Sequence, residues 1–211
     1  MTTTTALIAS IACGYLSGSV PFGYLAGKLK GLDIRQHGSG NIGATNAIRV
    51  LGKGIGIPVF ILDMLKGWLP VWLAAAWLEG TSVEMISTVK VIAGFAAVLG
   101  HMFTFWLSFK GGKGIATTAG VLLGIAPLAM LGGLAAFLLF FLPTRYVSLG
   151  SLAAAVGVPA TMAAQMARAG RWDFVMLSFG LVVMVLVFVR HRTNIQRLLA
   201  GTESRVGAKK S

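Results

Sequence analysis

A polar, glycine-rich segment at residues 37–51 (HGSGNIGATNAIRVL) carries the side chains best suited to holding an oxyanion. Three of its residues are glycines, which permit positive φ and let backbone N–H groups approach a ligand, and four more add neutral donors. These seven residues are Gly38, Gly40, Gly43, Ser39, Asn41, Thr45 and Asn46. We expect a short helix from Asn41, whose N-terminus and dipole favour an anion, with Arg49 as the cation. The segment predicts a phosphate site.

Two further basic segments could contribute to phosphate chemistry. Residues 109–117 (FKGGKGIAT) contain three glycines that can form a nest of N–H groups, and Lys113 supplies an ammonium at the start of the next helix. Lys110 fits equally well as a marker of the end of a membrane span. Residues 190–194 (RHRTN) contain His191, the histidine best placed for function. The glycines of the first of these segments are Gly111, Gly112 and Gly114.

Several familiar catalytic patterns do not fit these segments. Residues 38–43 match G-x-G-x-x-G, but a dinucleotide site needs a preceding strand, and an apolar run of membrane length precedes this one. Gly114 follows Lys113, whereas a Walker A motif needs Ser or Thr there. The three histidines and six carboxylates are scattered, and neither zinc spacing nor a Gly-x-Ser-x-Gly elbow occurs. We expect neither a metal nor a cofactor.

Composition predicts an all-α polytopic membrane protein with a single domain over residues 1–211. The chain is 56% hydrophobic and 11% charged, with a mean hydropathy of +0.82. Its net charge of +12 fits the positive-inside rule and anionic lipids or substrates, so nucleic acid is not an expected partner. Cys13 cannot form an intrachain disulfide. The N-terminus lacks a basic n-region, so we expect the first span to be retained.

Charge distribution predicts seven transmembrane helices, with the N-terminus outside and the C-terminus in the cytoplasm. Five apolar runs reach the ~20 residues that a bilayer core requires. They cover residues 5–27, 55–78, 85–108, 147–168 and 173–190. Residues 114–142 are too long for one straight span, and two short passes or a re-entrant pair turning near Pro127 place most basic residues on one side. All three polar segments then face the cytoplasm.

Three ionisable groups within apolar runs, and the polar tail, lead to structural expectations. Asp63 and Lys66 lie three residues apart in an apolar run, where a charge needs a partner, so we expect an ion pair. His101 is expected to be a hydrogen-bonded structural residue. The tail from Gly201 to Ser211 is expected to fray.

The three polar segments, taken with their surroundings, resemble a known family. GSGNIGATNAIRVLG, GHMFTFWLSFKGGKGIAT and RHRTNIQRLLAGTE resemble, in order and spacing, the three motifs of the bacterial acyl-phosphate:glycerol-3-phosphate acyltransferase family, the PlsY type. SGSVPFGYLAGKLKGLDIR and FILDMLKGW also look like the family, so the likeness extends over the whole chain. Thr104 stands where family members more often carry proline, from which we expect a small change in span geometry.

The resemblance implies an enzyme of the bacterial inner membrane, with its active site facing the cytoplasm. It would transfer a fatty acyl group from acyl phosphate to the sn-1 hydroxyl of glycerol 3-phosphate, the first committed step of bacterial phospholipid synthesis. Membrane lipids and the peripheral enzyme that produces acyl phosphate are candidate partners. The family's functional positions fall on Ser39, Arg49, Lys113, His191 and Asn194. The alternative is a membrane transporter or channel for a phosphorylated anion.

The spacing within residues 37–51 suggests two anion sites. Arg49 lies eight residues beyond Asn41, roughly 12 Å along a helix, which is too far for the helix N-terminus and Arg49 to hold one phosphate together. Two phosphorylated substrates would use two such sites.

Overall fold

The computed structural model describes residues 2–207, and these are folded almost entirely into helices, as composition predicts. The chain divides into two compact units, Met1–Ile125 and Ala126–Ser211, each of which is described here by itself. Among the described residues five helices are long and apolar enough to cross a membrane, or six when a bent pair counts as one span. The membrane-helical class is therefore confirmed, and seven spans remain a prediction.

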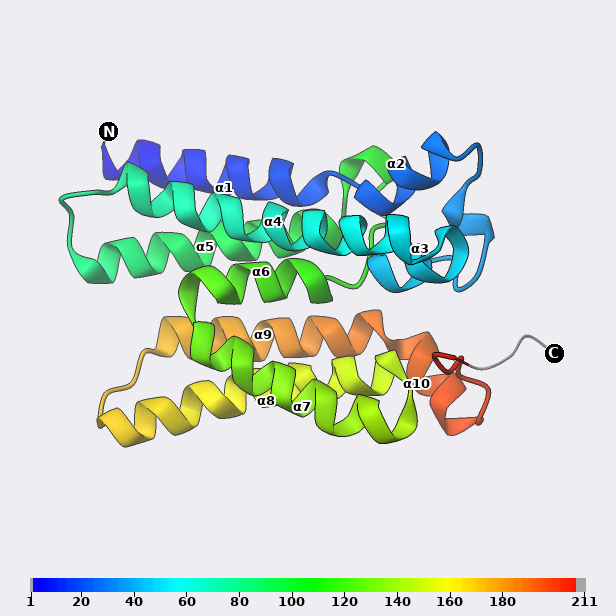
Figure 1. Cartoon of the computed structure of the whole chain (residues 1–211). Helices are drawn as coiled ribbons and strands as arrows, with labels where there is room; N and C mark the ends of the chain where they lie inside the picture. The colour runs from blue at the N-terminus through cyan, green and yellow to red at the C-terminus, as the bar shows by residue number, and fades with distance from the viewer. Residues whose placement is uncertain (1, 208–211) are drawn as a thin grey trace. The chain divides into compact units, whose positions relative to one another are not determined.

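The first unit is built from six α-helices and two short 3₁₀ turns (Figure 1). Within it α1 packs against α5 and α4, and α6 packs against α4 and α5. The elements are α1 (Thr3–Ser19), α2 (Phe22–Leu29), η1 (Ile34–Gln36), α3 (Ala44–Leu51), α4 (Lys53–Trp77), α5 (Val83–Met102), η2 (Phe105–Leu107) and α6 (Ile115–Ile125).

Glycines let α1 and α5 approach each other backbone to backbone. A Cβ added to Gly18 would lie 2.0 Å from the Ala97 carbonyl oxygen, and one added to Gly14 would lie 2.3 Å from that of Ala93. Small residues four apart are a common means of close helix packing in membranes, where hydrophobic burial gives no driving force between helices. This contact fixes α1 against the helix that leads to Lys113.

The first apolar run is broken at residues 20–21, so that α1 and α2 are separate helices. Pro21 lacks a backbone N–H and cannot continue the ladder of α1. After the break α2 packs against α3, η1 and α4 and supports the 37–51 segment. Gly23 of α2 is close to that segment, because an added Cβ would lie 1.9 Å from the Ile42 carbonyl oxygen.

The second unit contains four helices: α7 (Pro127–Thr144), α8 (Val147–Ala169), α9 (Phe174–Arg190) and α10 (Arg192–Leu199). Here α8 packs against both α7 and α9, and α10 is bent by 60° from α9. The break that we predicted in residues 114–142 falls at Ala126, so α7 starts with Pro127 where a missing N–H is harmless. The α6 helix has only 11 residues, roughly 16 Å, against the ~30 Å of a bilayer core.

Close packing at Gly18 leads to a test of the α1–α5 contact. Gly18→Leu should destabilise the protein by at least about 2 kcal/mol, because the new side chain meets backbone that cannot move aside. Thermal unfolding in detergent measures the loss. Gly54→Leu is the matched control, since nothing lies within 4 Å of an added Cβ there. Equal unfolding temperatures for the two variants would contradict the close contact.

Candidate active site

The 37–51 segment is folded around the side chain of Asn46, which is 1% exposed. Its Nδ2 donates to the carbonyl oxygens of Ile34 (3.2 Å), His37 (3.1 Å) and Asn41 (2.8 Å). Its Oδ1 accepts the N–H of Ser39 at 2.9 Å. Asn46, expected from its type to face a phosphate, is used here to hold the loop in shape.

Several backbone N–H groups of the loop are already used inside it. Besides that of Ser39, the N–H of Gly40 donates to the His37 carbonyl oxygen (3.1 Å), and that of Gly43 donates to Asn41 Oδ1 (2.8 Å). The expected cradle of free N–H groups is thus largely satisfied internally. The exposed polar side chains of the loop are those of His37, Ser39, Thr45 and Arg49.

The predicted helix start at Asn41 was wrong, because α3 begins at Ala44 after Gly43. The Asn41 side chain bonds to the Gly43 N–H and keeps residues 41–43 in a turn. Arg49 is therefore five residues from the first helical residue, roughly 7.5 Å along the axis. The spacing along α3 no longer requires two separate anion sites.

The turn at Gly38 brings Ser39 and Arg49 together. Gly38 has φ +62°, and an added Cβ would lie 2.3 Å from Asn46 Oδ1 and 3.4 Å from Arg49 Cδ. Only glycine fits this close approach without strain. The stem of Arg49 therefore runs beside the Gly38–Ser39 peptide, and its guanidinium has no hydrogen-bond or ion-pair partner within residues 2–207.

Arg35, the other arginine near the loop, is already neutralised. Its Nη2 lies 2.6 Å from Asp33 Oδ2, and its guanidinium stacks over the Tyr24 ring at 4.8 Å. The hydrogen bonds from Arg35 hold the pKa of Asp33 at about 2. Arg49 is therefore the cation of this segment available for an anionic ligand.

Residues 109–117, here called the lysine–glycine segment, are hydrogen-bonded to the end of α5. The N–H of Gly111 donates to the Met102 carbonyl oxygen (3.1 Å), and the N–H of Gly112 donates to that of His101 (3.0 Å). Two groups of the expected N–H nest are therefore used by the protein itself. Lys113 is half-buried and lies two residues before α6 begins. It precedes the helix N-terminus, close to where it was predicted to be.

A shared apolar cluster joins the first two polar segments inside the first unit. Ile42 and Ala47 of the 37–51 segment pack with Ile34, Val59 and Leu107, all at least 93% buried. Leu107 belongs to η2, two residues before the lysine–glycine segment. Ser39, Arg49 and Lys113 are thus carried by elements that rest on one core.

The third polar segment lies in the second unit, at the junction of the helices α9 and α10. His191 is the joint between α9 and α10 and is 2% exposed. Its Nδ1 lies 2.9 Å from the Val187 carbonyl oxygen, and because a carbonyl only accepts, Nδ1 donates. Neutral His191 then has its acceptor nitrogen at Nε2. Asn194, on the first turn of α10, is 4% exposed.

Glu203 holds this segment together. Its Oε1 accepts from Ser148 Oγ (2.7 Å) and Asn194 Nδ2 (2.6 Å), and its Oε2 accepts from Arg197 Nε (2.7 Å). The carboxylate fixes the Asn194 amide, because only Nδ2 can face it.

The expectation of a frayed tail was wrong for residues 201–207, and residues 208–211 lie outside the described part of the chain. The Val206 N–H donates to the Arg145 carbonyl oxygen (2.9 Å), and Arg205 contacts Tyr146. Glu203 and Ser148 were missed as site residues. The available signal was a single carboxylate within RHRTNIQRLLAGTE, amid four arginines between Arg190 and Arg205.

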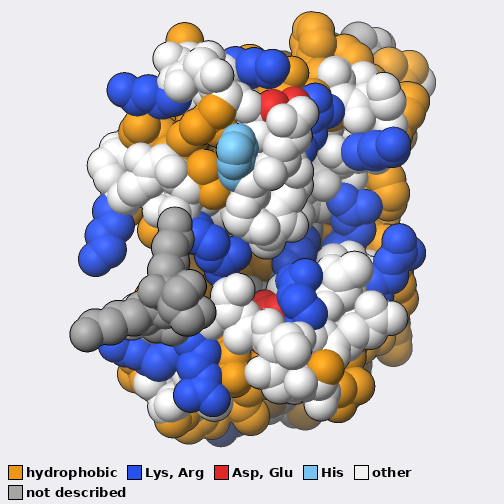
Figure 2. All heavy atoms as spheres, turned by 90° about the vertical axis from the view of Figure 1, so that its right-hand side faces the viewer, with side chains coloured by type: hydrophobic (Ala, Val, Ile, Leu, Met, Phe, Trp, Pro, Cys, Tyr) orange, Lys and Arg blue, Asp and Glu red, His pale blue; other side chains and the backbone are white. Residues whose placement is uncertain are grey.

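Basic side chains are frequent on the face at which α2 and α3 end, whereas acidic ones are few (Figure 2). In the first unit the exposed cations are Lys28, Lys30, Arg35, Arg49, Lys53 and Lys110. Such a face attracts phosphorylated solutes and anionic lipid headgroups. Within residues 2–207 no three His, Cys, Asp or Glu side chains are grouped so as to hold a metal ion.

The chain is similar to known proteins over nearly its whole length. The family model described as glycerol-3-phosphate acyltransferase matches residues 8–201. Relatives of that name from Geobacter sulfurreducens and a Synechococcus species are each 46% identical, over 93% and 94% of this chain and 96% and 94% of their own. Two crystal structures of PlsY (YgiH), an integral membrane glycerol 3-phosphate acyltransferase, are also similar. Its glycerol 3-phosphate form is 41% identical with a TM-score of 0.84, covering 95% of this chain and 96% of that one. Its lysophosphatidic acid form is 40% identical with a TM-score of 0.81, covering 95% of each chain.

Glu203 leads to a prediction about acid stability. Burial raises the pKa of this carboxyl, but hydrogen bonds from Arg197, Asn194 and Ser148 outweigh it, so the pKa lies below its usual value. Stabilisation by Glu203 is therefore complete above the ordinary carboxyl pKa, roughly 4.3, and is lost as the pH falls through the lower folded value. Glu203→Gln should cost about 2 kcal/mol at pH 7, with a smaller further loss on acidification.

Thermal unfolding in detergent between pH 7 and pH 3 measures both effects. Glu79→Gln removes an exposed carboxylate in the turn after α4 and serves as the control. If wild-type and Glu203→Gln protein lost the same stability between pH 7 and pH 3, the stabilising role of the Glu203 carboxylate would be contradicted.

Proposed function

Because the chain belongs to the glycerol-3-phosphate acyltransferase family, we propose that it transfers a fatty acyl group from acyl phosphate to the sn-1 hydroxyl of glycerol 3-phosphate. The products are lysophosphatidic acid and inorganic phosphate, and the reaction is the first committed step of bacterial phospholipid synthesis. One observation carries the proposal. The guanidinium of Arg49, which has no partner among residues 2–207, lies beside the Gly38–Ser39 turn, on the same core as the loop of Lys113.

The residues of the first unit would bind and neutralise phosphate groups. Arg49 and Lys113 supply positive charge, while the hydroxyls of Ser39 and Thr45 donate hydrogen bonds. Gly38, Gly112 and Gly114 admit close backbone approach, as Gly114 has φ +81°. Phosphate departing from the acyl group develops negative charge, which donors fixed before the reaction stabilise without reorganisation.

The chemical step exchanges one bond to the acyl carbon for another. The hydroxyl oxygen attacks the acyl carbonyl carbon, the bond from that carbon to the phosphate oxygen breaks, and the hydroxyl proton passes to a phosphate oxygen. We assign the proton to a substrate phosphate because Asp33 and Glu203 are both held in hydrogen bonds. A phosphate with a pKa near ~6 is partly basic at neutral pH. His191 and Asn194 complete the polar groups that the resemblance assigns to the reaction.

The protein would lie in the bacterial inner membrane with seven spans, its N-terminus outside and its C-terminus and reacting groups at the cytoplasmic side. Support comes from the basic residues, most of which this topology puts on one side of the bilayer. The acyl chain would remain among membrane lipids while glycerol 3-phosphate enters from water. A peripheral enzyme that makes acyl phosphate is a candidate partner for the basic face.

Purified protein in detergent, given palmitoyl phosphate and glycerol 3-phosphate, should form lysophosphatidic acid and one phosphate per turnover. A transporter or channel for a phosphorylated anion would leave its solute unchanged, so an absence of new product would contradict the proposal. Mass spectrometry of the product before acyl migration identifies the acylated hydroxyl.

Glycerol in place of glycerol 3-phosphate tests the proton acceptor. Glycerol alone should be inert, added phosphite should restore some turnover, and His191→Gln should keep measurable activity with the full substrate. Rapid acylation of glycerol without phosphite would refute the role of the substrate phosphate.

Lys113 and Lys110 form a matched pair in one loop. Lys113→Ala should lose about 3 kcal/mol of transition-state stabilisation, or ~100-fold in rate, because its ammonium faces the leaving phosphate. Lys110→Ala should lose little, since Lys110 is exposed before the glycines. Steady-state kinetics with both substrates varied measure the two losses. Equal, mild losses would instead indicate that both lysines only mark the end of a membrane span.

Topology is testable by thiol labelling of intact cells in a Cys13→Ser background. Thr144→Cys and Ser204→Cys should both be shielded from an impermeant reagent, because seven spans put residues 144 and 204 in the cytoplasm. Thr81→Cys, in the turn between α4 and α5, should be labelled from outside and is the positive control. Labelling at residue 204 would exclude this topology.

A further inference from the structure

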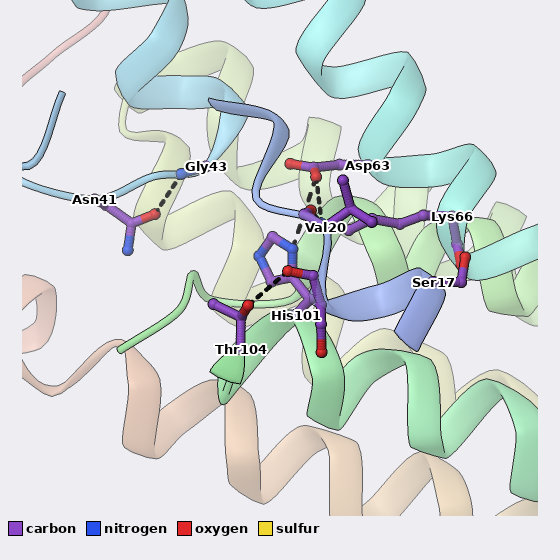
Figure 3. Close-up of polar contacts among 9 residues, drawn as sticks. Ser17, Val20, Asn41, Gly43, Asp63, Lys66, His101 and Thr104 are labelled. Atoms are coloured by element: carbon purple, nitrogen blue, oxygen red, sulfur yellow. Dashed lines mark hydrogen bonds and ion pairs between the residues drawn. The ribbon is translucent and has the colours of Figure 1, made fainter. Parts of the chain in front are cut away.

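Asp63 and Lys66 of α4 form a buried ion pair within the first unit. Lys66 Nζ is 2.7 Å from Asp63 Oδ1, and the two side chains are 4% and 2% exposed, as expected from their spacing (Figure 3). The same ammonium donates to the Val20 carbonyl oxygen at 2.7 Å. Val20 is the C-cap of α1, and its carbonyl oxygen also accepts the N–H of Phe22 at 3.1 Å, so two donors meet at the break before α2. Lys66 thus adds a charged hydrogen bond at the end of α1.

The end of α1 is tied to α4 and α5 by further hydrogen bonds. Thr104, 1% exposed, donates from Oγ1 to the Ser19 carbonyl oxygen at 2.6 Å. Ser17 donates to the Lys66 carbonyl oxygen (2.9 Å), and Tyr15 donates to that of Phe103 (2.8 Å). A proline at position 104, as the resemblance led us to expect, would lack this hydroxyl. Thr104 therefore adds a hydrogen bond at the break between α1 and α2.

His101 connects the ion pair to the lysine–glycine segment. Its Nδ1 is 3.8 Å from Asp63 Oδ1, too long for a hydrogen bond but close enough for charge to orient the ring (Figure 3). The opposite edge of the ring lies against Gly112, where an added Cβ would come within 2.2 Å of Nε2. The Gly112 N–H also donates to the His101 carbonyl oxygen. A shift of the His101 ring would therefore displace Gly112, the residue that precedes Lys113.

We propose that Asp63, Lys66 and His101 are positioning residues that set the place of the Lys113 loop and of the break between α1 and α2. This inference rests on the function proposed above for Lys113. Stability alone does not account for the pair, because a buried ion pair is often matched or exceeded by apolar side chains of similar volume. The contacts of the ion pair explain its presence better. Lys66 bonds to Val20, which leads into α2, and Asp63 lies beside His101, which packs against Gly112.

The first test is a double-mutant cycle between His101 and Gly112. Gly112→Ala should lower kcat/KM strongly, because the added methyl displaces the imidazole. In a His101→Ala background, where the ring is gone, the same substitution should cost at least about tenfold less. The kcat and KM for glycerol 3-phosphate are measured for all four proteins. Additive losses would overturn the contact as the link to the loop.

The second test reads loop position without turnover. Lys113→Cys in a Cys13→Ser background places a thiol in the loop, and its rate of reaction with a small charged reagent is measured in detergent. Asp63→Asn with Lys66→Met removes both charges together and so avoids an unpaired buried charge. This change should alter the thiol rate by about fivefold or more. Thr88→Val is the control, because the Thr88 hydroxyl donates to the Glu84 carbonyl oxygen in its own helix.

The outcomes separate the inference from the proposed function. An unchanged thiol rate in folded Asp63→Asn, Lys66→Met protein would overturn the positioning role, even where the wild type is an active acyltransferase. An inert wild type would contradict the proposed function, while the thiol rates would still decide whether the cluster positions the loop. If the paired substitution does not fold, the His101–Gly112 cycle decides instead.

Discussion

A helix that ends in the protein interior leaves carbonyl groups without helical donors, and the break between α1 and α2 creates such an end at Ser19, which is buried, and Val20. Lys66 and Thr104 donate hydrogen bonds to the carbonyl oxygens of Val20 and Ser19, respectively. The break allows α2 to leave the line of α1 and to support η1 and α3. Without these donors the Ser19 carbonyl would lose its hydrogen bond from Thr104 and the Val20 carbonyl would keep only that from Phe22, so the break that places α2 beneath the 37–51 segment would be less stable.

The 37–51 loop and the lysine–glycine loop are held in shape in related ways. In each, backbone N–H groups donate to acceptors within the protein, through Asn46 in one and through the last carbonyls of α5 in the other. Glycine then serves close packing as much as ligand approach, as at Gly38 beside Asn46 and Gly112 beside His101. In the proposed function, phosphate binding therefore falls to side chains and helix starts.

Sequence reasoning found the membrane-helical class, the break before Pro127 and the Asp63–Lys66 pair, because apolar length, proline chemistry and the cost of intramembrane charge are local properties. It misjudged Glu203 and Asn46 because their roles depend on what folds against them. Residue type shows that Asn46 can donate, but only the fold shows that Ile34 and His37 accept. The start of α3 was misplaced because Asn41 can serve a turn as readily as a helix.

The internal hydrogen bonds of the 37–51 loop have a kinetic consequence. A loop whose backbone is already bonded does not need to rearrange when an anion arrives or departs. Exchange then requires motion only of exposed side chains, which occurs on the picosecond to nanosecond scale, whereas loop opening takes microseconds to milliseconds. In the proposed site, the release of a phosphate from Ser39, Thr45 and Arg49 is accordingly governed by the strength of charged hydrogen bonds, and binding weakens with added salt.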